Sequence, residues 1–184
     1  MLIIGRWYDP LTAGEQWRAG IDPKKAASDY VRMQERHYKE MPEILYWEGH
    51  NEPSFGAPQD VEARDGMRWY AGFEAERVRI LADMGLRAVV GNFSTGYPEV
   101  ENDNRLWEEF LPALEAAHEH KGFLGLHEYS GPFMWSGWGL STQGPRMANV
   151  TRLILTMIQA GSPCVTERCT ARFSHHERWV VCRL

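Results

Sequence analysis

Two glutamates stand at the ends of apolar runs of the kind that form buried strands. Glu52 follows the run 44–48 after a bend at Gly49, and Glu167 closes the run 163–167. The carboxyl ends of parallel strands meet at one edge of a sheet, so we expect these two side chains to lie close together. A carboxyl group that keeps its proton and a second one that stays ionised can combine acid/base and nucleophilic catalysis. The sequence therefore predicts a two-carboxylate active site.

The remaining predicted strands also end in polar or ionisable residues. Arg6 lies near the end of the first apolar run, Asn92 ends the third, and His127 and Tyr129 end the fourth. In a parallel sheet these side chains gather at the same edge as the two glutamates. We interpret them as candidate substrate-binding residues, and their gathering as the main functional signal in the sequence.

The elements that must position these residues alternate between strand and helix, with a repeat of about 40 residues. Apolar runs predict strands over 2–8, 44–48, 86–92, 123–129 and 163–167, and amphipathic spacing predicts helices over 22–41, 60–84, 104–120 and 145–160. Asp22-Pro23 provides a start signal for the first helix, and Gly85 a stop signal for the second. Because strands joined by helical crossovers are parallel, the expected fold class is α/β, with about five parallel strands and four helices.

The length of the chain limits how much of a barrel these elements can build. A closed (β/α)8 TIM barrel takes roughly 250 residues, whereas this chain has 184. We therefore expect a partial barrel over residues 1–167, which would be the catalytic domain. Residues 168–184 show neither helical nor strand periodicity, and we predict an irregular C-terminal tail there.

A short motif connects this pattern to a known superfamily. Asn51-Glu52-Pro53 resembles the Asn-Glu-Pro signature of clan A glycoside hydrolases, which are (β/α)8 barrels with an acid/base glutamate at the end of strand four. If the run 44–48 is strand four, His127-x-Tyr129 ends strand six and Thr166-Glu167 ends strand seven, the position of the family's nucleophile. The resemblance covers about residues 2–167 and implies that strands one, two and eight are absent. Arg168-Cys169 stands where the family usually has Cys or Phe and then Gly.

The resemblance implies specific roles for the residues of this motif and of strands six and seven. Glu52 would be the acid/base and Glu167 the nucleophile of a retaining, double-displacement hydrolysis of O-glycosidic bonds. Asn51 would hydrogen-bond the 2-hydroxyl group of the sugar. His127 or Tyr129 would orient the nucleophile or contact the carbohydrate substrate.

Tryptophans offer candidate stacking surfaces for a sugar ring. The chain has eight, and Trp47, Trp135 and Trp138 lie near polar strand ends rather than within helical stripes. A flat aromatic ring can pack against a sugar, but the same residues are equally typical of core or rim packing. Both interpretations remain open for each tryptophan.

Two other classes of function compete with a glycosidase. The chain could be a truncated, weakly active or inactive barrel fragment that self-associates or only binds carbohydrate. A partial barrel exposes sheet edges and apolar surface, so we expect a homo-oligomer, most simply a dimer in which two copies cover the open barrel. An esterase is a further alternative, for which Ser94 in Gly91-Asn-Phe-Ser94-Thr-Gly96 is the only sign. Asn92 there breaks the Gly-x-Ser-x-Gly pattern.

Composition excludes several classes of partner and cofactor. The net charge of -5 argues against nucleic acid, and no apolar run approaches the length needed to cross a membrane. The three cysteines lack zinc-like spacing, so we expect no metal and no cofactor. No signal peptide is recognisable, which makes a cytoplasmic location the default expectation.

Overall fold

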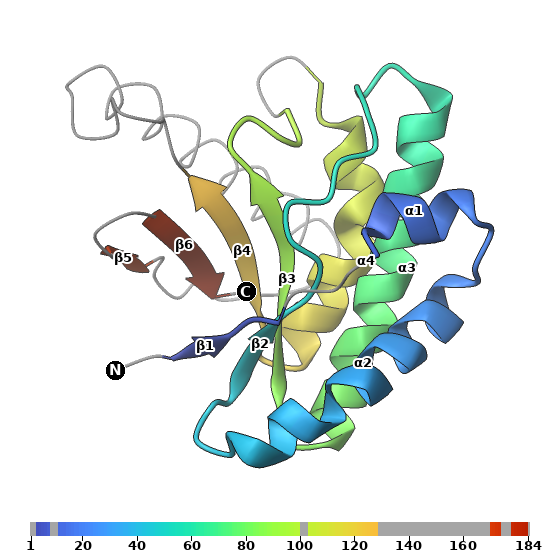
Figure 1. Ribbon diagram of the computed structural model, residues 1–184. Helices are drawn as coiled ribbons and strands as arrows, with labels where there is room; N and C mark the ends of the chain where they lie inside the picture. Colours follow the sequence, from blue (N-terminus) through green and yellow to red (C-terminus); the bar gives the residue numbers. More distant parts are fainter. Residues whose placement is uncertain (1–2, 8–10, 100–102, 129–169, 174–177, 184) are drawn as a thin grey trace.

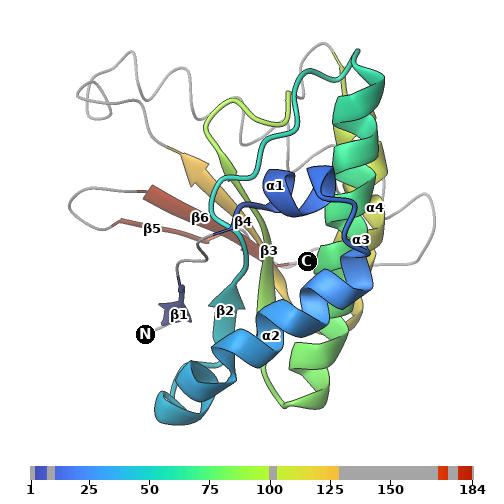
Figure 2. The same ribbon diagram turned by 45° about the vertical axis from the view of Figure 1, so that its right-hand side comes forward.

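The chain folds into a six-stranded sheet with helices packed on one of its faces (Figure 1). The computed structural model describes residues 3–7, 11–99, 103–128, 170–173 and 178–183. The view turned by 45° shows the described helices on the same side of the sheet (Figure 2). No helix in these described ranges is long and apolar enough to cross a membrane.

The described elements alternate strand and helix over the first 128 residues. In chain order they are β1 (Ile4–Gly5), α1 (Ala13–Arg18), α2 (Pro23–Glu40), β2 (Tyr46–Glu48), α3 (Val61–Asp83), β3 (Arg87–Ser94), α4 (Arg105–Glu119), β4 (Phe123–Glu128), β5 (Thr170–Phe173) and β6 (Arg178–Arg183). The alternation predicted from the sequence is confirmed up to β4. The predicted helix 145–160 and strand 163–167 lie outside the described residues.

Local capping chemistry explains where the helices begin and end. The Asp22 side chain accepts a hydrogen bond from the Lys25 backbone N–H, and Pro23 occupies the first helical position, as predicted. Gly85, with φ of +78°, follows the last residues of α3. The short helix α1 was not predicted, and it starts at a capping box formed by Thr12 and Glu15.

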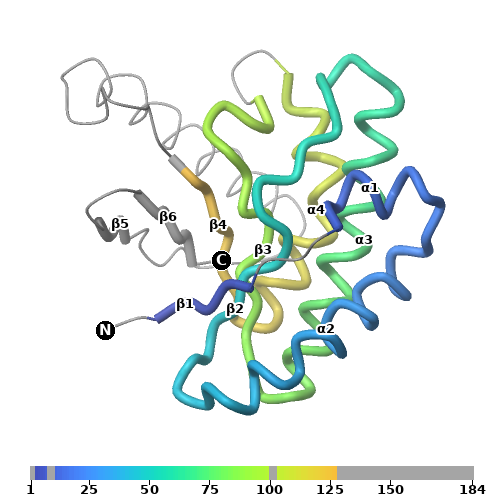
Figure 3. The backbone as a smooth tube through the Cα atoms, in the orientation of Figure 1, coloured from blue at the N-terminus to red at the C-terminus, as the bar shows by residue number. Residues whose placement is uncertain are grey.

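Strands β1 to β4 form a parallel sheet in the order β1-β2-β3-β4. Figure 3 follows the chain from β2 through the loop 49–60 beside β3 and into α3. This crossover brings the chain back to the amino end of the sheet before β3 begins, so the carboxyl ends of the four strands share one edge. The α/β class and the parallel strands are therefore confirmed.

The expectation of an irregular tail is wrong for residues 170–173 and 178–183. These residues form β5 and β6, an antiparallel pair in which β6 also pairs antiparallel with β4. Trp179, Val180 and Val181 are residue types that favour strands, and β4 offers an otherwise unpaired edge. The neighbour of β4 in the described sheet is thus an antiparallel strand rather than the next parallel strand of a barrel.

The main core fills the space between the sheet and the helices. It is rich in aromatic rings, and Phe93, Trp107 and Phe110 from β3 and α4 pack there with Tyr70 of α3. The opposite face of the sheet carries a much smaller apolar cluster around Val89 and Phe123. Burial on the helical face therefore holds the strands in register, which leaves the second face and the strand ends available for polar side chains.

Candidate active site at the carboxyl ends of the strands

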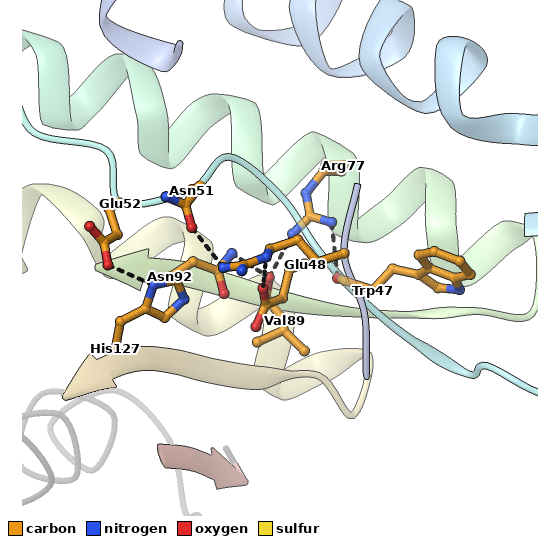
Figure 4. A network of polar contacts seen from close by, with 9 residues as sticks. Trp47, Glu48, Asn51, Glu52, Arg77, Val89, Asn92 and His127 are labelled. Atoms are coloured by element: carbon orange, nitrogen blue, oxygen red, sulfur yellow. Dashed lines mark hydrogen bonds and ion pairs between the residues drawn. The ribbon is translucent and has the colours of Figure 1, made fainter. Parts of the chain in front are cut away.

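Polar side chains from all four parallel strands converge at the carboxyl edge of the sheet. Arg6 follows β1, Glu52 follows β2, Asn92 belongs to β3 and His127 to β4. Figure 4 shows Glu52, Asn92 and His127 lying together there. The gathering predicted from the strand ends is present among the described residues.

Glu52 makes the contact that defines the site. Its Oε1 atom lies 3.1 Å from Nδ1 of His127, whose side chain is only 5% exposed, whereas that of Glu52 is 29% exposed. A neutral imidazole protonated at Nδ1 donates to the carboxylate, and a protonated carboxyl group can instead donate to Nδ1. The pair therefore presents a hydrogen-bonded carboxyl group that remains accessible to a ligand.

The backbone at Glu52 adopts a left-handed conformation that β3 supports. Its φ is +46°, which is uncommon for a residue with a side chain. The Glu52 backbone N–H donates to the carbonyl of Asn92 at 3.0 Å, so the end of β3 holds the residue in place. Backbone strain of this kind persists only where the surroundings stabilise it, and it is enriched at functional sites.

Asn92 supports the site through its backbone more than through its side chain. It also has a positive φ, of +52°, and the pairing of β3 with β4 shifts register between Gly91 and Phe93. The side chain is fully buried, and a Cβ on Gly125 would come within 2.3 Å of its Oδ1 atom. Glycine at position 125 therefore makes room for the amide that the sequence analysis assigned to substrate binding.

Asn51 and Arg6 form a second polar pair beside Glu52. A guanidinium N–H of Arg6 donates to Oδ1 of Asn51 at 2.7 Å, and Nε of Arg6 lies 3.8 Å from Oε2 of Glu48. Glu48 is nearly buried on the face of β2 opposite Trp47. Strand alternation places Glu48 on the face that carries the site. Arg6 thus links Asn51 to the buried carboxylate of Glu48.

Trp47 does not belong to the candidate site, which corrects the sugar-stacking prediction for this residue. Its side chain is 2% exposed, its indole N–H donates to the Ile44 carbonyl at 3.0 Å, and its ring packs edge-on against Tyr38 of α2. A Cβ on Gly5 would collide with the indole ring. The core-packing interpretation is therefore correct for Trp47, because its position in β2 turns the ring toward the helices.

His50 also points away from the polar edge. It is buried against the rings of Tyr30 and Phe73. Burial, with a smaller effect from the Arg77 guanidinium, lowers the pKa of His50 to about 3. The imidazole is therefore neutral at physiological pH and packs as an aromatic ring of the core.

Four predicted site residues, Glu167, Tyr129, Trp135 and Trp138, lie outside the described residues. The described part of the chain contains no group of three or more metal-ligating side chains. Comparison with family models, with curated proteins and with solved structures found no match to this chain. The chemistry of the site must therefore be argued from its geometry.

Proposed function

We propose that this chain is a retaining glycoside hydrolase in which Glu52 is the acid/base and Glu167 the nucleophile. The observation that supports the proposal best is the partly exposed carboxyl group of Glu52 beside a buried imidazole, at the carboxyl edge of a parallel sheet. Asn51 lies next to Glu52 and is oriented by Arg6, which suits the hydrogen bond to a sugar 2-hydroxyl that the sequence resemblance implies.

The mechanism uses the Glu52 carboxyl group twice, first as an acid and then as a base. Glu52 donates its proton to the glycosidic oxygen as the bond to the anomeric carbon breaks, while the second carboxylate forms a glycosyl ester with that carbon. Glu52, now ionised, then takes a proton from the water that cleaves the ester. His127 stabilises the ionised carboxylate between these steps by donating a hydrogen bond from Nδ1.

The sheet is consistent with a partial barrel, and we propose that β1 to β4 correspond to strands three to six of a (β/α)8 fold. Consecutive parallel strands, each followed by a helix on the same face of the sheet, are the arrangement that such barrels repeat. On this proposal, the face that carries Glu48, Asn92 and His127 corresponds to the barrel interior. Glu167 lies in sequence between β4 and β5, outside the described residues.

The test is hydrolysis of a panel of chromogenic aryl glycosides by the full chain and by matched glutamate variants. We expect Glu52→Gln to abolish turnover of substrates with poor leaving groups and to retain partial turnover of dinitrophenyl glycosides, which need no acid. Azide should restore that variant, because azide attacks the glycosyl ester without a general base. Glu167→Gln should be inactive on every substrate, and the exposed Glu62→Gln is the matched control.

Two results would overturn the proposal. One is full activity in both Glu52→Gln and Glu167→Gln, which would separate the hydrolysis from these carboxyl groups. The other is carbohydrate binding without hydrolysis by the unaltered chain, which would favour the non-catalytic fragment.

A further inference from the structure

Helix α3 carries a buried polar cluster that the proposed reaction does not use. Its members are Tyr70, Glu74 and Arg77, and each side chain is fully buried. Arg77 and Glu74 form an ion pair at 2.7 Å, and Oη of Tyr70 lies 2.8 Å from Oε1 of Glu74. Burying two charges is unfavourable unless hydrogen bonds compensate for the lost hydration, so the contacts of this cluster indicate what it does.

Arg77 ties together the two strands that lead into the site. Its guanidinium donates to the carbonyl of Trp47 in β2 at 3.2 Å and to the carbonyl of Val89 in β3 at 2.8 Å. Figure 4 shows Arg77 reaching from α3 to both strands. One buried side chain thus bridges β2 and β3 just before Gly49 and Gly91.

Gly49 lies directly against the ion pair. A Cβ at this position would come within 2.6 Å of Oε1 of Glu74 and 3.0 Å of Nε of Arg77. Neither side chain has room to move, because both are fully enclosed in the core. The backbone that leaves β2 toward Glu52 therefore rests on this cluster, and only glycine allows the approach.

Tyr70 holds the end of β3 in the same way. Its Oη atom lies 3.1 Å from the carbonyl of Gly91, a residue with φ of +87° at the register shift of β3. Burial raises the pKa of Tyr70 well above its usual value, so the hydroxyl keeps its proton. The next residue, Asn92, supplies the carbonyl that accepts the Glu52 N–H.

We propose that Tyr70, Glu74 and Arg77 form a positioning unit that holds Glu52 in its left-handed backbone conformation through Gly49 on one side and Gly91-Asn92 on the other. The unit contacts the backbone leading to Glu52 and never the carboxyl group itself. The effect of the positioning unit on the reaction rests on the proposed function, whereas the effect of the unit on the backbone does not.

The variant that tests the unit is Tyr70→Phe, which removes one oxygen and keeps the aromatic packing. The matched control is Leu81→Ala, a buried truncation on the same helix that leaves all three members of the unit in place. Amide hydrogen exchange of the full chain, followed by NMR, reports the opening of the hydrogen bond from the Glu52 N–H to the Asn92 carbonyl. We expect Tyr70→Phe to speed exchange at Glu52 about tenfold relative to the amides of α4, the size of effect that the loss of one buried hydrogen bond produces.

In Leu81→Ala, protection at Glu52 should fall no further than that of the α4 amides. If Tyr70→Phe changes the exchange rates of the Glu52 amide and the α4 amides equally, the proposal is overturned. If the chain hydrolyses a glycoside, Tyr70→Phe should lower kcat about tenfold with little change in KM, because the carboxyl group is misplaced after substrate has bound. If the unaltered chain hydrolyses none, the proposed function fails and the exchange measurement still decides the role of the unit.

Discussion

Glu52 and His127 lie 3.1 Å apart, although 75 residues separate them in the chain. Glu52 follows β2 and His127 belongs to β4, two strands that do not pair with each other because β3 lies between them in the sheet. The two side chains therefore meet over the end of β3, where a register shift and two positive φ angles bend the backbone. The pair depends on three strands, which makes it sensitive to changes in any of them.

The first prediction concerns this pair. Replacing His127 by Ala should lower kcat/KM for aryl glycosides about tenfold to hundredfold, the usual effect of removing a hydrogen bond to a charged group. The loss of kcat/KM should be smallest for dinitrophenyl glycosides, because the first step of their hydrolysis needs no acid. His120→Gln, a change at the end of α4 far from the site, should leave the kinetics unaltered. Equal rates for His127→Ala and the unaltered chain would remove His127 from the mechanism.

The second prediction concerns pH and His50. The folded state keeps this imidazole neutral down to about pH 3, whereas the unfolded chain protonates it below about pH 6.5. The unfolded state therefore binds more protons between these values, and stability falls as the pH is lowered through this window. The slope from one such group is about 1.4 kcal/mol per pH unit at most.

Urea denaturation at several pH values between 7 and 5 gives the free energy of unfolding and hence this slope. Most carboxylates titrate below this pH range. His50→Phe, which keeps an aromatic ring beside Tyr30 and Phe73, should flatten the dependence. His120→Gln should keep it. A slope that is unchanged in His50→Phe would contradict the assignment.

The third prediction compares two glycines. Gly49→Ala should destabilise the fold by about 1–3 kcal/mol, because the added methyl group meets the enclosed Glu74–Arg77 pair. Gly72→Ala, within α3, meets Pro23 at 3.4 Å and gains helix propensity, so its effect should be near zero or stabilising. Thermal unfolding of the two variants separates these outcomes. A Gly49→Ala variant as stable as the unaltered chain would show that the strand end can move.

The fourth prediction is self-association. In the sheet that the described residues form, β1 is an edge strand of only two residues, and Ile3, Trp7 and Leu45 around it are each more than two-fifths exposed. An open edge with large apolar side chains favours pairing with a second copy. Light scattering should report a dimer at micromolar concentration, and Trp7→Glu should shift it toward monomer. A stable monomer over the whole concentration range would contradict this expectation.

The amino-acid sequence by itself determined the alternation of strands and helices up to residue 128 and the polar character of the strand ends. Asp22-Pro23 and Gly85 mark helix boundaries through local backbone preferences, and Glu52 follows an apolar run through a glycine bend. These features depend on neighbours within a few residues, which periodicity and capping rules describe well.

Only the tertiary structure decided which of these residues meet and which way each one faces. Trp47 and Glu48 point to opposite faces of β2. Because the helices pack on one face only, Trp47 became a core residue and Glu48 lies beside Arg6. Strand β6 was missed because its pairing partner, β4, lies 50 residues away and sets its register. The contact of Glu52 with His127, like the support from Tyr70 and Arg77, arises from packing between distant segments, and no local pattern encodes it.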